Sequence, residues 1–209
     1  IPKGMIWNMV YAPEIFDPDG RNGTLGEITQ EQLWARLTEF LCEMLPVAEE
    51  AGVKLALHPD DPPLPSLRGT ARLVYQPRIY DRVLDVYDSP MNTLEFCLGT
   101  LSEMSEGDIY EVVDRYSRLR KIAYIHFRNV RGKVPHYDEV FIDEGDVDMI
   151  RVLRILHRNG YDGVLIPDHT PAMSCAAPWH AGMAYALGYM RAAVRVIERL
   201  TIERLTIDH

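Results

Sequence analysis

The sequence predicts an α/β protein built from parallel strands, and three observations lead to this prediction. Short apolar segments of strand type alternate along the chain with longer segments whose apolar residues recur every three to four positions. Strands that are separated by helices pair in parallel through right-handed crossovers. Titratable side chains end four of the apolar segments, which is typical of a barrel that carries its chemistry at one end of its strands.

The composition is that of an ordinary globular protein. The 209 residues are 47% hydrophobic and 25% charged, which is enough apolar material for one core, so we expect one catalytic domain over residues 1–209. A formal net charge of -9 and the lack of a Lys/Arg cluster argue against a nucleic acid or an anionic membrane as partner. Three widely spaced cysteines and no signal-peptide pattern indicate a reduced, cytoplasmic protein.

The first half of the chain opens with a strand and a helix. Residues 4–11 (GMIWNMVY) are expected to form a strand, because aromatic and aliphatic residues dominate them. A helix is predicted over residues 28–52, with Thr29 as its N-cap and Gly52 as its end. The apolar segment 53–58 (VKLALH) follows as the second strand.

The remaining segments continue the alternation. We expect helices over residues 78–88, 107–118, 148–163 and 180–200, and strands over residues 93–97, 121–127 and 164–169. Five strands therefore alternate with five helices, as about five βα units.

The architecture that fits best is a (β/α)8 barrel. A doubly wound sheet normally has a glycine-rich phosphate loop after its first strand, and the sequence has none. A whole barrel has about 250 residues, so we expect the C-terminal portion of a barrel that lacks its first three strands. An incomplete barrel exposes strand edges, so we also expect a homo-oligomer, most simply a dimer.

Four titratable residues end successive strands: His58, Cys97, His126 and Asp168. Two imidazoles, a thiolate and a carboxylate bind first-row divalent metals, and parallel strands of one barrel bring them to a common point. The mixed donors exclude calcium and leave manganese, iron, cobalt or zinc. Each residue alone also has a structural explanation, as a hydrogen-bonded histidine, an apolar filler or a turn cap. The pattern alone leaves both interpretations open.

The segments around these residues resemble one enzyme family. The blocks GVKLALHPDDPPLPSLRGTARLV, SPMNTLEFCLGTLSEM, IAYIHFRNV, GDVDMIRVLRILHRNGYDG and PDH occur in the order found in mannonate dehydratases, over about residues 4–195. These enzymes are metal-dependent lyases with a xylose-isomerase-like (β/α)8 barrel. The resemblance implies that His58, Cys97, His126 and Asp168 hold a metal, usually Mn2+, with Fe2+, Co2+ and Zn2+ as alternatives. It also implies the dehydration of D-mannonate, a small sugar acid, to 2-dehydro-3-deoxy-D-gluconate in glucuronate catabolism.

Two further residues are candidates for the chemistry. Arg128 lies two residues after His126, on the same face if the strand continues, where it could clamp a substrate carboxylate. A surface salt bridge explains Arg128 equally well. His169 follows Asp168, and the resemblance implies that it exchanges protons with the substrate.

Other residues near these blocks are candidates for weaker roles. Asp60 and Asp61 could orient the ring of His58, because metal-bound imidazoles usually donate their other N–H to an oxygen, and Asp60 is also a candidate for contact with the substrate. Tyr137 lies on a loop that we expect over the same face. Trp179 is a bulky candidate where family members carry a tyrosine.

Two positions depart from the family pattern. Ile166 stands where an arginine is common, and Thr170 stands where a glycine is common. Because these positions flank Asp168 and His169, two alternatives stay open. One is a sugar isomerase or epimerase on the same barrel, and the other is an inactive homologue that binds a metal or a sugar acid.

Overall fold

The centre of the protein is a parallel sheet of four strands. The computed structural model describes residues 6–7, 9–15 and 27–207. The sheet has the order β10-β7-β6-β3 and comprises β3 (Leu55–Leu57), β6 (Asn92–Cys97), β7 (Ile122–His126) and β10 (Val164–Ile166). His126 is in register with Cys97 on one side and with Ile166 on the other. The carboxyl ends of the strands therefore lie at one edge of the sheet.

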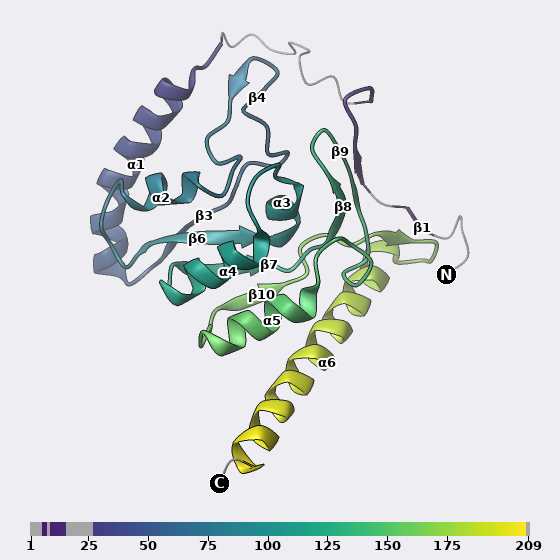
Figure 1. Ribbon diagram of the computed structural model, residues 1–209. Coiled ribbons are helices and arrows are strands. Elements are labelled where there is room, and N and C mark those ends of the chain that lie inside the picture. Colours follow the sequence, from purple (N-terminus) through teal and green to yellow (C-terminus); the bar gives the residue numbers. More distant parts are fainter. Residues whose placement is uncertain (1–5, 8, 16–26, 208–209) are drawn as a thin grey trace.

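Helices connect these strands, as the sequence predicts. They are α1 (Gln30–Ala51), α2 (Ile79–Leu84), α4 (Ile109–Arg118), α5 (Met149–Arg158) and the closing helix α6 (Pro178–Ile207). Helices α4 and α5 lie side by side across the strands, and α6 runs away from the sheet toward the C-terminus (Figure 1). No helix in the described ranges combines the length and the apolar character needed to cross a bilayer.

Local side-chain chemistry explains where the helices begin and end. Thr29 forms a capping box with Gln32 at the start of α1, because each residue accepts a hydrogen bond from the backbone N–H of the other. Gly52 ends α1 at a φ of 65°, a left-handed conformation that glycine adopts without steric cost. Asp108 and Asp148 cap α4 and α5.

The described residues of the segment 4–11 contain strands, as expected, but not one strand that belongs to the parallel sheet. Within that range the structure describes two short strands, β1 (Ile6–Trp7) and β2 (Val10–Tyr11), and neither joins the parallel sheet. Strand β1 pairs antiparallel with β11 (Ala172–Met173), and β2 pairs antiparallel with β9 (His136–Glu139). These partners lie in the loops that follow β10 and β7, so this segment covers the end of the sheet where the titratable residues are.

Several elements have no counterpart in the sequence-based prediction. The hairpin of β8 (Val130–Lys133) and β9 forms a three-stranded antiparallel sheet with β2. A short helix, α3 (Leu98–Glu103), begins directly after β6, and β4 (Ser66–Leu67) pairs with β5 (Thr70–Ala71) in the loop after β3. Four strands, and not five, make up the parallel sheet of the described chain. The homo-oligomer stays a prediction.

The core is formed by the sheet with buried side chains from the helices packed on it, including α1, α2, α4, α5 and α6. Phe96 is the last residue of β6 but one and is fully buried. Its ring stacks on Tyr80 of α2 at 5.2 Å between centroids and meets the edge of Tyr116 of α4 at 5.7 Å. Three elements therefore converge on one ring, which fixes the strand that ends at Cys97.

We expect Phe96→Ala to lower the free energy of unfolding by about 3–5 kcal/mol, because it leaves a cavity among rings that cannot collapse onto it. Urea denaturation followed by circular dichroism measures the change. Phe40→Ala is the matched control, since Phe40 is 51% exposed on α1, and should shift stability little. Equal losses in the two variants would show that Phe96 is not central to the core.

Candidate functional site

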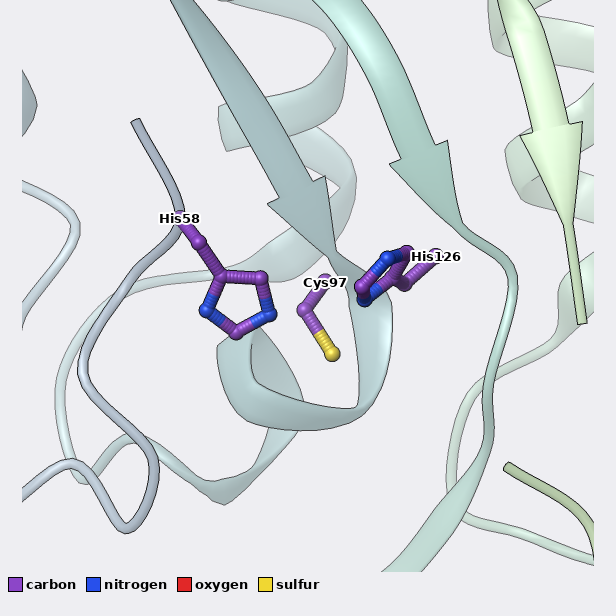
Figure 2. Close-up of side chains that lie close together, drawn as sticks. All are labelled: His58, Cys97 and His126. Atoms are coloured by element: carbon purple, nitrogen blue, oxygen red, sulfur yellow. The ribbon is translucent and has the colours of Figure 1, made fainter. Parts of the chain in front are cut away.

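Three of the predicted ligand residues converge at the carboxyl ends of the strands. His58 follows β3, Cys97 ends β6 and His126 ends β7. Each offers one ligand atom, and the three atoms lie within 4.8 Å of one another. Figure 2 shows the Cys97 side chain between the two imidazole rings, whose centroids are 5.2 Å apart. The parallel register of the strands produces this convergence.

Asp168 lies beside this cluster. It follows β10 by two residues, and its Oδ2 is 3.4 Å from Nδ1 of His126. Its backbone has a φ of 63°, in the left-handed region that aspartate tolerates better than most residues. The fourth predicted ligand therefore borders the cluster on its His126 side.

Glu95 is a site residue that sequence reasoning missed. Its Oε1 lies 2.6 Å from Nε2 of His126. Glu95 is two residues before Cys97 on β6, so both side chains point to the same face of the strand. That spacing was a usable signal, because an acidic residue inside an apolar strand is costly unless it has a partner.

The surroundings of Cys97 and His126 shift the pKa values of both side chains toward their charged forms. Burial alone raises the pKa of the Cys97 thiol, but the charge of Arg128 and hydrogen bonds with His126, His58 and Thr100 lower it to about 5. Burial lowers the pKa of His126, whereas the polar contacts and negative charges of the neighbouring Asp168 and Cys97 raise it to about 10. Cys97 is therefore a thiolate at neutral pH, the form in which cysteine binds metals.

The donor set fits a divalent transition metal. A thiolate and two imidazoles within 4.8 Å, with a carboxylate next to them, match the ligands that such ions take from proteins. Nδ1 of His126 is buried 3.4 Å from Oδ2 of Asp168 but forms no well-directed hydrogen bond among the described residues, while Nε2 faces Glu95. A buried nitrogen without a well-directed hydrogen bond is costly, and coordination to a metal would satisfy it. Its pairing with Glu95 resembles the carboxylate contact that orients many metal-bound histidines.

Arg128 occupies a different position from the one expected. The side chain is only 2% exposed and contacts five acidic groups, namely Asp61, Glu103, Glu139, Asp168 and the sulfur of Cys97. Gly99 makes room for it, because a Cβ at that position would lie 2.6 Å from its Nε. The surface salt bridge is therefore corrected, whereas the clamp on a substrate carboxylate stays a prediction. The guanidinium is internal to the site and holds other side chains.

Asp60 and Asp61 also differ from expectation, since neither has a contact with His58 among the described interactions. The carboxylate of Asp60 accepts hydrogen bonds from the backbone N–H groups of Leu73 and Val74 and pairs with Arg72. Asp60 therefore fixes the loop after β3 and does not orient His58 among the described interactions, whereas its contact with the substrate stays a prediction. Nδ1 of His58 instead lies 2.5 Å from the carbonyl oxygen of Pro59.

Asp61 links the loop after β3 to the small antiparallel sheet. The hydroxyl groups of Tyr137 and Thr100 donate hydrogen bonds to its carboxylate, at 2.9 and 3.0 Å, and Arg128 pairs with it. The ring of Tyr137 stacks on Tyr11 of β2 at 5.3 Å. Asp61, Tyr137 and Tyr11 are thus connected by direct contacts.

A pocket of about 450 Å3 opens over the cluster. Its lining comes from β2, the loop after β3, β7, β9 and the loop after β10, and consists of Met9, Val10, Tyr11, His58, Asp61, His126, Tyr137, Glu139, Asp168 and His169. Trp179 does not belong to this lining. It lies half-exposed at the start of α6, with its ring against His180, and its contact with the substrate stays a prediction.

His169 faces the pocket from the loop after β10. The ring is 47% exposed, and its Nδ1 lies 3.0 Å from Oε1 of Glu139, while its Nε2 lies 3.6 Å from Oδ1 of Asp168. The hydrogen bond with Glu139 and its negative charge raise the pKa of His169, against the effect of burial. The pocket therefore places a titratable imidazole next to the cluster of predicted ligands.

The chain matches a family model described as D-mannonate dehydratase (UxuA) over residues 23–200. The chain belongs to this family. It is 34% identical to a mannonate dehydratase of Streptococcus agalactiae over 166 residues, which are 78% of this chain and 47% of that protein. It is 36% identical to mannonate dehydratase 2 of Halalkalibacterium halodurans over 146 residues, which are 68% of this chain and 42% of that protein. The chain spans about half the length of these curated relatives.

Solved structures agree with the family assignment. The crystal structure of the mannonate dehydratase from Streptococcus suis serotype 2 superposes with a TM-score of 0.84 at 27% identity, over 96% of this chain and 60% of that chain. A D-tagatose 3-epimerase-like protein superposes with a TM-score of 0.60 at 21% identity, over 84% of this chain and 62% of that chain, which is a likeness of fold alone. The predicted fold class, an α/β protein of the xylose-isomerase-like barrel type, is confirmed.

In the metal-free protein we expect Cys97 to titrate with a midpoint near pH 5, as a thiolate above it and as a neutral thiol below it, because the pKa is lowered to about 5. The ultraviolet absorbance of the thiolate, taken as the difference between wild type and Cys97→Ser, measures this titration. Arg128→Met should move the midpoint to higher pH, since it removes the nearest positive charge. A wild-type midpoint above pH 8 would contradict the prediction.

Proposed function

We propose that this protein acts as a metal-dependent lyase that dehydrates D-mannonate to 2-dehydro-3-deoxy-D-gluconate. The observation that carries the proposal is the convergence of His58, Cys97 and His126 under a pocket that also contains His169, in a chain of this family. The proposed substrate is a small sugar acid from hexuronate breakdown, in line with the names of the relatives.

We propose that His58, Cys97, His126 and Asp168 hold the metal. Acidic groups outnumber cationic groups around these four residues. The single guanidinium of Arg128 contacts four carboxyl groups and a thiolate. A buried excess of negative charge is costly, and a dication would offset it. We propose Mn2+ as the metal, with Fe2+, Co2+ and Zn2+ as alternatives that the same donors accept.

The reaction needs a base at one carbon and an acid at the next. A proton leaves C2, the bond between C3 and its hydroxyl oxygen breaks, and the departing hydroxide takes up a proton to become water. The resulting enol then rearranges to the ketone at C2. When bound, the metal supplies a Lewis acid that stabilises negative charge on the substrate.

The residues of the chain provide the other parts. His169 lines the pocket and can exchange a proton with the substrate at Nε2, because Glu139 occupies its Nδ1. Asp61 and Tyr137 form a polar wall that can accept hydrogen bonds from sugar hydroxyls. Tyr11 and Met9 add apolar surface to the lining of the pocket.

Incubation of the metal-loaded protein with D-mannonate tests the proposal. A dehydratase releases a 2-keto-3-deoxy acid, which a colorimetric assay for such acids detects. An isomerase or epimerase retains the water and gives no such product, and a binding protein returns the substrate unchanged. The epimerase alternative is not favoured, because the likeness to epimerase structures concerns the fold alone.

We predict that the reconstituted protein carries about one transition-metal ion per chain, and that His126→Ala and Cys97→Ser each reduce this content severely, because each removes a ligand from a site of three or four. Metal analysis by mass spectrometry after gel filtration gives the stoichiometry. His157→Ala on α5 is the control, since His157 lies outside the pocket. An unchanged metal content in both site variants would exclude the site.

We predict that His169→Gln keeps the metal content of the wild type and lowers kcat by about 10² to 10⁴-fold, because a side chain that transfers a proton in the transition state contributes in that range. Steady-state kinetics and metal analysis on the same sample separate the two effects. Loss of the metal together with activity would make His169 a ligand or a support for Asp168.

A further inference from the structure

Glu139 joins the pocket histidine to the buried arginine through a single oxygen atom. Its Oε1 lies 3.0 Å from Nδ1 of His169 and 2.5 Å from NH1 of Arg128. We propose that Glu139 is the positioning residue of the site, which holds His169 by Nδ1 and thereby directs Nε2 toward the bound sugar acid. The catalytic part of this inference rests on the proposed function, whereas the orientation of the ring does not.

Glu139 is itself firmly held. It ends β9, its carboxylate is only 7% exposed, and its backbone N–H donates a hydrogen bond of 2.9 Å to the carbonyl oxygen of Met9. The buried guanidinium of Arg128 anchors the carboxylate at the same oxygen atom. A buried carboxylate with a charged partner has little rotational freedom, so it can fix the position of a more mobile group.

His169, in contrast, needs a support. It lies on the loop after β10, and nearly half of its surface is exposed. An exposed imidazole on a loop rotates freely unless one of its nitrogens is bound. The bond from Nδ1 to Glu139 therefore determines where Nε2 lies.

The same bond favours a proton on Nδ1, because the Glu139 carboxylate lies 3.0 Å from Nδ1, whereas the Asp168 carboxylate lies 3.6 Å from Nε2. A carboxylate only accepts hydrogen bonds, so the neutral ring next to Glu139 keeps its proton on Nδ1 and has a lone pair on Nε2. A lone pair at Nε2 is what a base needs in order to take a proton from the substrate. Without the carboxylate, both forms of the neutral ring become accessible.

The small antiparallel sheet helps to place Glu139. Strand β2 pairs with β9, and Val10 is in register with Asp138, next to Glu139. Met9 both lines the pocket and accepts the bond from the Glu139 backbone. The segment around β2 thus contributes to the site through the placement of Glu139.

Three variants test the proposal. Glu139→Leu removes the acceptor, while four acidic partners of Arg128 remain in place. Glu139→Gln keeps an oxygen that can accept from both neighbours but removes the charge. Asp138→Asn is the matched control, because it removes a charge from the adjacent residue, which has no contact with His169 among the described interactions.

The first measurement is the position of the proton on the neutral ring of His169. Two-bond 1H–15N correlation spectra show it, and the loss of signals in His169→Gln assigns the resonances to this ring. We expect the proton on Nδ1 in wild type, Asp138→Asn and Glu139→Gln, and a shift toward Nε2 in Glu139→Leu. Wild-type protein with its proton on Nε2 overturns the proposal, whatever the variants do. This arm needs no activity and no folded Glu139→Leu protein, so it stays informative if the proposed reaction is not found.

The second measurement is steady-state kinetics with D-mannonate on samples of equal metal content. We expect kcat to fall by about 10²-fold in Glu139→Leu with a nearly unchanged KM, because a misdirected base affects the chemical step more than binding. Glu139→Gln should recover most of that loss, and Asp138→Asn should stay within about two-fold of wild type. Equal losses in the Leu and Gln variants, with the proton still on Nδ1 in both, would show that Glu139 acts by charge alone and would overturn the proposal.

Discussion

A single buried guanidinium holds the site together. Arg128 lies two residues after the end of β7. It contacts acidic groups from four other parts of the chain, namely the loop after β3, α3, β9 and the loop after β10. A charge in the interior is tolerated only when partners replace the water that it has lost. Each of these segments is therefore tied to Arg128, and through it to the others.

This arrangement also explains the unusual protonation of the site. The charge of Arg128 helps to keep Cys97 as a thiolate although the sulfur is fully buried. Glu103 shows the opposite result, because burial raises its pKa to about 9, so that it is neutral at pH 7 in spite of its contact with Arg128. One cation cannot compensate all the acidic groups around it, and the remainder must take up protons or another cation.

The strand-end residues were predictable from the sequence because they depend on local pattern. The alternation of apolar residues located β3, β6, β7 and β10, and parallel pairing then required His58, Cys97 and His126 to converge. The cap at Thr29 and the stop at Gly52 were likewise local signals.

The rest of the site depends on contacts between segments distant in sequence. The role of Arg128 follows from Asp61, which lies 67 residues earlier, and from the hairpin of β8 and β9, whose short polar strands lack apolar alternation. The segment 4–11 has the composition of a buried strand, yet its described parts pair with loop strands. The composition of this segment predicts an extended backbone, but it does not predict which strands the segment pairs with.

The backbone conformation of Asp168 limits which residues can stand at that position. With a φ of 63°, the position suits glycine, asparagine and aspartate, and it disfavours glutamate, alanine and larger residues, whose Cβ groups crowd the backbone there. Of the two acidic amino acids, only aspartate thus combines the required charge with an acceptable backbone. Asparagine removes the charge without adding strain, so the difference between Asp168→Asn and Asp168→Ala separates the chemistry of the carboxylate from the geometry of the loop that carries it.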